Sequence, residues 1–190
     1  METKAFQLKV TLRHTKPPIW RRLEVRGDTT LGRLHHVLQV AMGWTDSHLH
    51  QFVAKGKCYG APDREFGLDR ENEDTTRLDQ VLRKPNDKLI YEYDFGDGWE
   101  HEVLLEKLLP IVPGRRRYPM VTGGRRACPP EDCGGIPGYY RLLEVLGNPS
   151  HPEHEELLEW SGGEYEPDRL DIQAINRVFH GGWAPAKPHA

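Results

Sequence analysis

The sequence predicts an α+β domain: a mainly antiparallel sheet of about five strands, covered by one long helix and followed by a C-terminal helical segment. Apolar and polar residues alternate in several short runs, which is the period of a half-buried strand. Between the second and third of these runs, apolar residues recur every three or four positions, as they do in an amphipathic helix. Longer stretches with helical spacing return only after the last alternating run.

The first two expected strands form a hairpin. Apolar residues alternate with polar ones from Phe6 to Leu12, and they recur at even spacing again from Ile19 to Val25. Lys-Pro-Pro at residues 16–18 separates the two runs, because proline has no amide proton to donate to a β-ladder. We therefore expect the second strand to return antiparallel beside the first.

The covering helix is expected at residues 30–43. Asp28, Thr29 and Thr30 stand at its start, and their side-chain oxygens can accept hydrogen bonds from the free amides of a first helical turn. Apolar residues then follow at helical spacing: Leu31, Leu34, Leu38, Ala41 and Met42. Gly43 marks the end, because glycine readily adopts the left-handed conformation that terminates helices.

Three more strands are expected in the middle of the chain. Residues 48–54 alternate, whereas residues 55–75 are polar and rich in turn formers, which predicts a long surface excursion. Residues 89–95 and 99–105 also alternate, and Gly-Asp-Gly between them is a turn sequence. These last two runs predict a β-hairpin.

The C-terminal part is expected to be a long loop followed by helices. For about twenty residues after Leu109, apolar residues follow neither the alternation of a strand nor the spacing of a helix. Loops of that length in compact domains are usually functional or mobile. Helical spacing follows near residues 139–146, near residues 152–160 and from Asp171. We expect residues 1–180 to form a single domain and residues 181–190 a flexible tail.

Charge is distributed unevenly along a chain whose formal net charge is −3. Residues 1–26 carry seven Lys and Arg against two Glu, and residues 111–127 carry five Arg and no acid. Residues 131–171 carry eleven Asp and Glu against two Arg. Such an asymmetry marks a binding face in some proteins, but more often the charged residues are simply solvated surface.

The hydropathy pattern and the cysteine count indicate a cytoplasmic protein with no membrane contact. No signal peptide is visible at the N-terminus, and no apolar run approaches the ~18 residues of a membrane-spanning helix. The chain has three cysteines, Cys58, Cys128 and Cys133. An odd number in a reducing compartment favours free thiols or metal ligation over a disulfide framework.

Two loop motifs are the most specific features of the sequence: FGDGWEH at residues 95–101 and CPPEDCGG at residues 128–135. In the first motif, Asp97 and His101 are candidate catalytic residues, with the imidazole as a base that the carboxylate orients. The alternation of the strand also points His101 inward. A hydrogen-bonded core histidine and an ordinary turn aspartate therefore remain the alternative.

The second motif and the nearby histidines indicate a zinc site. The two cysteines are separated by four residues, whereas a zinc knuckle has two, so further ligands have to come from other segments. The candidate ligands are His48, His50, His101, Cys128, Glu131 and Cys133. Alternatively, the two cysteines pack as small apolar groups, and Glu131 and Asp132 cap the following helix.

A third group of candidates lies in the long loop. Two short arginine runs occur there: Arg115, Arg116 and Arg117, then Arg125 and Arg126. Because arginine pairs bidentately with phosphate, a nucleic-acid interface is one of the expected roles. The chain as a whole lacks the basic charge of a dedicated nucleic-acid-binding protein.

Several familiar enzyme motifs are absent from the sequence. It contains no Gly-rich phosphate loop, no GxGxxG after a strand, no GxSxG elbow and no HExxH. The sequence therefore argues against nucleotide hydrolysis by a P-loop, against Rossmann redox chemistry and against serine hydrolysis of the familiar kind.

Taken in order, the motifs resemble the plasmid pRiA4b ORF-3-like family, which includes passenger proteins of insertion elements. The resemblance spans residues 4–180 and is carried by PPIWRRLEV, AMGW, HLHQF, YEYDFGDGWEHEVLLE, CPPEDCGG with GYYRLLEVL, and DRLDIQAINRVF. It implies a compact α+β domain found in bacteria and archaea, often near mobile elements. It implies no particular reaction.

On these grounds we expect an uncharacterised, non-enzymatic binding domain that acts on a protein or nucleic-acid partner in mobile-element biology. No complete catalytic set is visible in the sequence. The alternative is a zinc-dependent hydrolase or metal-binding domain that uses His101 with Cys128 and Cys133. Both hypotheses depend on the two loop motifs converging in the fold.

Overall fold

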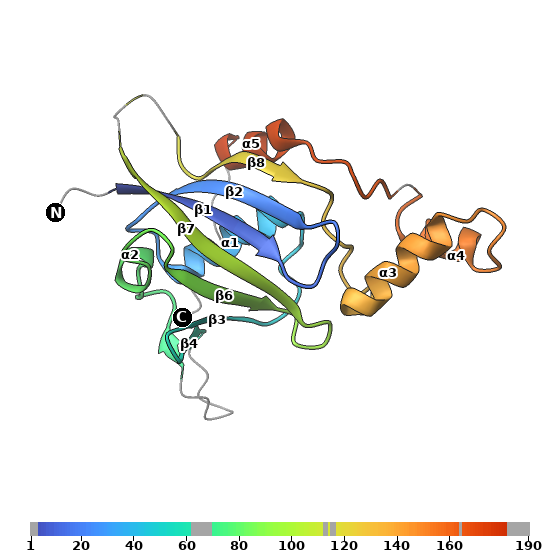
Figure 1. Ribbon diagram of the computed structural model, residues 1–190, viewed down its shortest axis with the longest axis horizontal. Helices are drawn as coiled ribbons and strands as arrows, with labels where there is room; N and C mark the ends of the chain where they lie inside the picture. The colour runs from blue at the N-terminus through green and yellow to red at the C-terminus, as the bar shows by residue number, and fades with distance from the viewer. Residues whose placement is uncertain (1–3, 62–69, 112–113, 115–116, 164, 182–190) are drawn as a thin grey trace.

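The computed structural model describes residues 4–61, 70–111, 114, 117–163 and 165–181. Within these residues the chain forms one eight-stranded sheet with the order β5-β4-β3-β6-β7-β1-β2-β8 (Figure 1). The strands are β1 (Lys4–Leu12), β2 (Ile19–Arg26), β3 (His50–Ala54), β4 (Lys57–Gly60), β5 (Glu71–Asn72), β6 (Lys88–Tyr93), β7 (Trp99–Pro110) and β8 (Met120–Arg125). Neighbouring strands are antiparallel except β4 and β5, which pair in parallel.

This sheet corrects the expected fold class, a sheet of about five strands covered by one long helix. The five expected segments form β1, β2, β3, β6 and β7, but three further strands are present. β4 and β5 lie in the segment expected as a surface excursion, and β8 lies in the expected loop. β5 has only two residues, and β8 contains two adjacent glycines, so neither shows the alternation by which strands are recognised.

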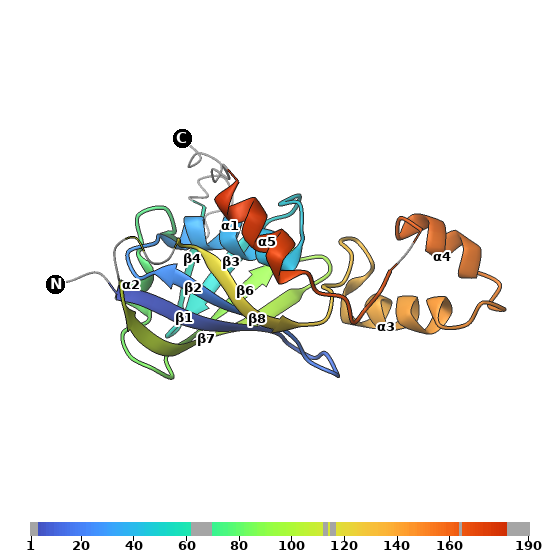
Figure 2. The same ribbon diagram turned by 90° about the horizontal axis from the view of Figure 1, so that it is seen from above.

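The helical cover also differs from the expectation. The helices are α1 (Leu31–Met42), α2 (Leu78–Val81), α3 (Gly135–Leu146), α4 (His154–Trp160) and α5 (Ile172–His180). α1 and α5 lie on one side of the sheet, whereas α3 and α4 extend away from it (Figure 2). Two helices, α1 and α5, thus cover this face of the sheet together. The other pair, α3 and α4, forms a separate helical hairpin at one end of the molecule.

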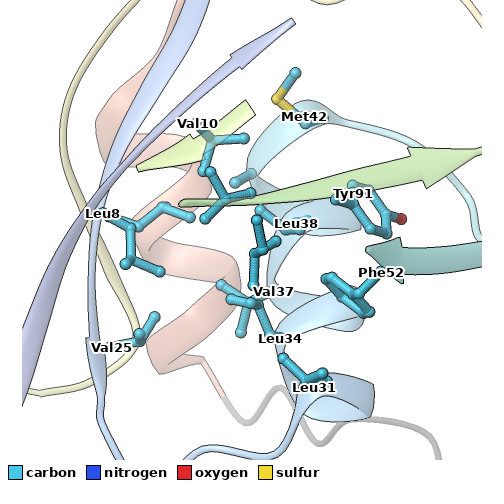
Figure 3. Close-up of a cluster of buried hydrophobic side chains, with 14 of the residues drawn as sticks. Leu8, Val10, Val25, Leu31, Leu34, Val37, Leu38, Met42, Phe52 and Tyr91 are labelled. Carbon is cyan, nitrogen blue, oxygen red and sulfur yellow. The ribbon is translucent and has the colours of Figure 1, made fainter. Parts of the chain in front are cut away.

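The hydrophobic core lies between α1 and the sheet, as the close-up in Figure 3 shows. The side chain of Thr30 accepts a hydrogen bond from Arg33 N at 3.3 Å and caps α1, and Gly43 ends the helix with φ 92°. The buried face of α1 packs on inward residues of several strands, among them Leu8, Val10, Val25, Phe52 and Tyr91.

One charged side chain, Arg21, is buried in this core with an exposed fraction of 2%. Its Nε donates to Ala41 O at 2.9 Å, in the last turn of α1, and its Nη1 donates to Trp20 O at 2.9 Å and Arg125 O at 3.2 Å. The guanidinium therefore satisfies one carbonyl oxygen at the negative end of the helix dipole and two carbonyl oxygens of strands. It joins α1 to β2 and β8.

None of the described helices is long and apolar enough to cross a membrane. The expected single domain at residues 1–180 stays a prediction. Apart from Gly181, the expected tail at residues 181–190 lies outside the described residues.

Candidate functional site

Three side chains with metal-ligand atoms converge just beyond the end of β6, and we call them the carboxylate site: His48, Asp94 and Asp132. The Nε2 atom of His48 lies 3.1 Å from Asp132 Oδ1 and 3.7 Å from Asp94 Oδ2. The side chain of Asp94 is 10% exposed and that of Asp132 is 70% exposed. The site is therefore buried on one side and open to water on the other.

The backbone at the end of β6 explains the position of Asp94. Its amide donates to Leu49 O at 2.8 Å, just beyond the last paired residues of β3 and β6. Asp94 has φ 56°, and its Oδ1 accepts from the amides of Gly96 and Asp97 at 3.0 and 3.3 Å. Because Oδ1 closes the turn, Oδ2 is left to face His48.

Asp132 is placed by the cysteine loop, residues 128–135. Asp132, Gly134 and Gly135 all have positive φ, at 60°, 89° and 65°. Gly134 N donates to Asp97 Oδ2 at 3.1 Å, which ties the cysteine loop to the hairpin tip between β6 and β7. A Cβ on Gly135 would lie 2.4 Å from Asp97 O, so glycine is required for this approach. The two loop motifs thus converge.

Glu131, a predicted metal ligand, is occupied by hydrogen bonds that clamp the cysteine loop to the loop before β3. Tyr93 OH donates to its Oε1 at 2.5 Å, and the amide and hydroxyl of Thr45 donate to its Oε2 at 3.0 and 2.6 Å. Ser47 N in turn donates to Tyr93 OH at 3.0 Å. Burial, together with the Glu131 carboxylate, raises the pKa of Tyr93, so the phenol remains a donor.

The environment of His48 Nε2 favours a cation. The atom is buried and makes no hydrogen bond, although Asp132 Oδ1 lies 3.1 Å away. Two ligand atoms held about 2.0–2.1 Å from a tetrahedral zinc ion lie about 3.3–3.4 Å apart. The distances from Nε2 to the two carboxylate oxygens, 3.1 and 3.7 Å, bracket that value. All three ligand atoms lie within 4.8 Å of one another.

A second group with ligand atoms, His35, His36 and Asp46, is closed by its own hydrogen bonds. Asp46 N donates to Gln39 Oε1 at 2.9 Å, and Gln39 Nε2 donates to Tyr91 OH at 2.9 Å. Tyr91 therefore donates its proton to His35 Nδ1 at 2.8 Å, and His35 Nε2 donates to Asp46 Oδ1 at 2.7 Å. A metal ion on His35 Nε2 would push the ring proton onto Nδ1, against the Tyr91 hydroxyl proton. This ring of hydrogen bonds supports the fold better than it supports an ion.

The other two predicted histidine ligands are not members of the carboxylate site. His50 stacks on His35 with ring centroids 3.4 Å apart, and its Nε2 lies 2.9 Å from Glu73 Oε2. His101 has no exposed surface, and its Nδ1 lies 3.3 Å from Tyr91 O. Burial lowers the pKa of His101 to about 4, so the ring is neutral at pH 7. Its Nε2 is also buried without a hydrogen bond, but within the described residues His101 belongs to no cluster of three ligand atoms.

The two cysteines of the loop motif pack against the hydrophobic core. Burial raises the pKa of Cys128 and of Cys133 to about 12, so both are thiols at neutral pH. Their loop is anchored to the core by Trp44, whose Nε1 donates to Pro129 O at 3.0 Å, and by Tyr165, whose hydroxyl donates to Cys128 O at 3.1 Å. Within the described part of the chain, neither sulfur belongs to a cluster of three ligand atoms.

The predicted arginine interface is only partly described. Two of its members lie outside the described residues: Arg115 and Arg116. Arg117 and Arg125 are exposed, whereas Arg126 is buried. Its Nε donates to Pro167 O at 3.3 Å and lies 3.3 Å from Asp168 Oδ1. Arg126 is therefore engaged within the protein.

Comparison with known proteins agrees with the motif resemblance. Residues 4–174 match the sequence profile of the family described as Plasmid pRiA4b ORF-3-like protein. The chain belongs to this family. The chain is also similar to "Uncharacterized protein y4hQ" of Sinorhizobium fredii (strain NBRC 101917 / NGR234), with 39% identity over 180 residues, 94% of this chain and 92% of that protein.

A solved structure shares the fold of this pRiA4b ORF-3-like chain. The crystal structure of a protein of unknown function, MM3350 from Methanosarcina mazei Go1, superimposes with a TM-score of 0.83 and 35% sequence identity. The match covers 92% of this chain and 98% of that chain. Neither relative carries a name that states an activity, so function in this family has to be argued from the site.

In this pRiA4b ORF-3-like chain, the carboxylates that approach His48 are neighbours of those singled out in the sequence. Asp94 stands at the start of the turn that contains Asp97, and Asp132 directly follows Glu131. The sequence does contain a signal for these two carboxylates. Both loop motifs are short and glycine-rich, and aspartate adopts positive φ in such loops more readily than most residues do. The second ligand group, His35, His36 and Asp46, has no comparable signal.

Proposed function

We propose that this chain is a divalent-metal-binding domain whose ion is held by His48, Asp94 and Asp132. The observation that carries this proposal is the buried Nε2 atom of His48, which makes no hydrogen bond and lies 3.1 and 3.7 Å from two carboxylate oxygens. His48 and the largely buried Asp94 are thus poorly arranged for a hydrogen bond but well arranged to coordinate a metal ion.

The donor set defines the class of ion. One imidazole and two carboxylates suit zinc, manganese and ferrous iron, whereas calcium and magnesium prefer oxygen ligands alone. Three protein ligands leave at least one position for water or for a group of a binding partner. A dication would also compensate the two carboxylate charges that the fold brings together.

The clamp around Glu131 supports the same proposal. Coordinating residues work best when neighbouring hydrogen bonds fix them in place. Glu131, Tyr93 and Thr45 fix the backbone immediately before Asp132, while the turn amides fix Asp94 through its Oδ1. By contrast, only His48 of the six ligands expected from the sequence belongs to this site, and His101, Cys128 and Cys133 do not.

Metal titration of chelator-stripped protein tests the proposal. We expect isothermal titration calorimetry at pH 7 to give one equivalent of bound zinc or manganese. Asp132→Asn should weaken binding by at least about tenfold, and His48→Ala should do the same. Asp132→Asn is the cleaner variant, because the residue is largely exposed and asparagine tolerates its φ of 60°.

Two matched variants separate this site from its competitors. His36→Ala removes a ligand from the second group, and Cys128→Ser removes a ligand expected from the sequence. Both should bind metal as the unaltered chain does. Absence of stoichiometric binding in the unaltered chain, or binding that survives His48→Ala and fails in Cys128→Ser, would overturn the proposal.

A further inference from the structure

Residues of α3, α4 and the cysteine loop line a groove of about 570 Å³. The two helices lie in the part of the molecule that extends from the sheet (Figure 1). Apolar and acidic side chains both line it: Leu142, Leu157, Trp160, Asp132, Glu153 and Glu156. Its size lies within the range of ligand-binding clefts. Asp132 belongs to both the groove and the carboxylate site, whereas none of the other lining residues is a member of that site.

Helix α4 has little packing of its own. It has seven residues, none of them buried, and Trp160 at its end is 46% exposed. A helix this short is marginal without tertiary contacts. Tryptophan is enriched at protein interfaces because it offers a large, rigid apolar surface with a polar edge. α4 therefore presents apolar surface of the kind that a partner covers.

The chain segment that carries this groove is acidic, and the groove itself is lined by three carboxylates and one arginine. Residues 131–163 contain seven Asp and Glu and a single Arg. That residue, Arg141, is paired with Glu153 at 2.5 Å. Three exposed carboxylates on α4 have no ion pair with any described residue: Glu155, Glu156 and Glu159. Of these three carboxylates, Glu156 lines the groove together with Trp160.

We propose that the α3–α4 groove binds a basic, amphipathic peptide segment of a partner protein. Apolar side chains of that segment pack on Leu157 and Trp160, and its lysines or arginines pair with the carboxylates of α4. Charge decides the class of partner, because an acidic surface repels both nucleic-acid phosphates and anionic lipid headgroups. The inference does not depend on metal binding at the carboxylate site.

Two synthetic peptides provide the test. One is an amphipathic helix built from leucine and lysine, and the other has every lysine replaced by glutamate. Fluorescence anisotropy of the labelled peptides against the full chain should show saturable one-to-one binding of the lysine peptide and none of the glutamate peptide. Affinity should fall as salt is raised, because exposed ion pairs are screened.

Variants distinguish docking in the groove from general attraction to an acidic surface. Trp160→Ala should weaken binding of the lysine peptide by at least about tenfold, as expected for a central aromatic contact. The matched control is Val178→Ala, which removes another exposed apolar side chain, 50% exposed and on α5. Equal affinities for both variants, or equal binding of the glutamate peptide, would overturn the proposal.

Discussion

The Nε2 atom of His48 and the Oδ1 atom of Asp132 lie 3.1 Å apart, although the strands beside them are distant in the sheet. His48 precedes β3, Asp132 follows β8, and β6, β7, β1 and β2 lie between those two strands. The cysteine loop therefore crosses the end of the sheet to reach His48. The contact depends on the residues that hold this loop in place.

The first prediction concerns Glu131, which holds the loop through Tyr93 and Thr45. Glu131→Ala should reduce the free energy of unfolding by about 1–3 kcal/mol, because hydroxyl and amide donors lose their acceptor. It should also weaken metal binding about tenfold, since Asp132 is no longer positioned. Urea unfolding and calorimetric titration measure the two effects. An unchanged metal affinity would show that the clamp does not position the site.

The second prediction concerns pH and His101. Burial lowers its pKa in the folded chain from 6.5 to about 4, so the unfolded chain binds the proton more readily. Stability should therefore fall as the pH drops below about 6.5, by about 1.4 kcal/mol per pH unit and about 3 kcal/mol near pH 4. Urea unfolding of the chain and of His101→Phe over this range isolates the contribution. Parallel pH dependences for the two proteins would contradict it.

The third prediction concerns Gly138 in α3. A Cβ there would lie 1.7 Å from Cys133 O, a backbone atom of the loop that carries Asp132. Gly138→Ala should destabilise the chain by about 1–3 kcal/mol through overpacking. The matched control is Gly123→Ala, whose Cβ would meet its nearest neighbours at 3.7 Å. If thermal unfolding shows the same loss for both variants, the close approach is not a constraint.

The fourth prediction concerns Arg21, whose buried guanidinium donates to three carbonyl oxygens. Arg21→Met should cost about 2–4 kcal/mol, because charged hydrogen bonds are lost and carbonyls stay buried. The adjacent Arg22 pairs with Glu106 but is 32% exposed, so Arg22→Met should cost less than about 1 kcal/mol. Equal losses in urea unfolding would refute this difference.

The sequence located the strands that alternate and missed those that do not. From Phe6 to Leu12 in β1 and from Trp99 to Leu105 in β7, every second residue is buried, and all of these except His101 are apolar. β5 and β8 gain their strand geometry from pairing with β4 and β2 at the two sides of the sheet. Strands formed mainly by such long-range pairing leave little local pattern in the sequence. For that reason the predicted number of strands in the sheet was wrong.

The candidate site was predictable to the level of segments but not of side chains. The sequence drew attention to the hairpin tip and the cysteine loop, and Asp97 and Gly134 do join them. Alternation cannot assign side-chain direction where the backbone is left-handed, as it is at Asp94 and Asp132. The carboxylates facing His48 were therefore identified only from the structure.

The position of a bound ion tests the central claim most directly. Crystals soaked in zinc chloride and measured at the zinc absorption edge should give one strong anomalous peak. We expect it about 2.0–2.2 Å from His48 Nε2, Asp94 Oδ2 and Asp132 Oδ1. A peak between Cys128 and Cys133 instead, or no ordered peak at all, would contradict the account.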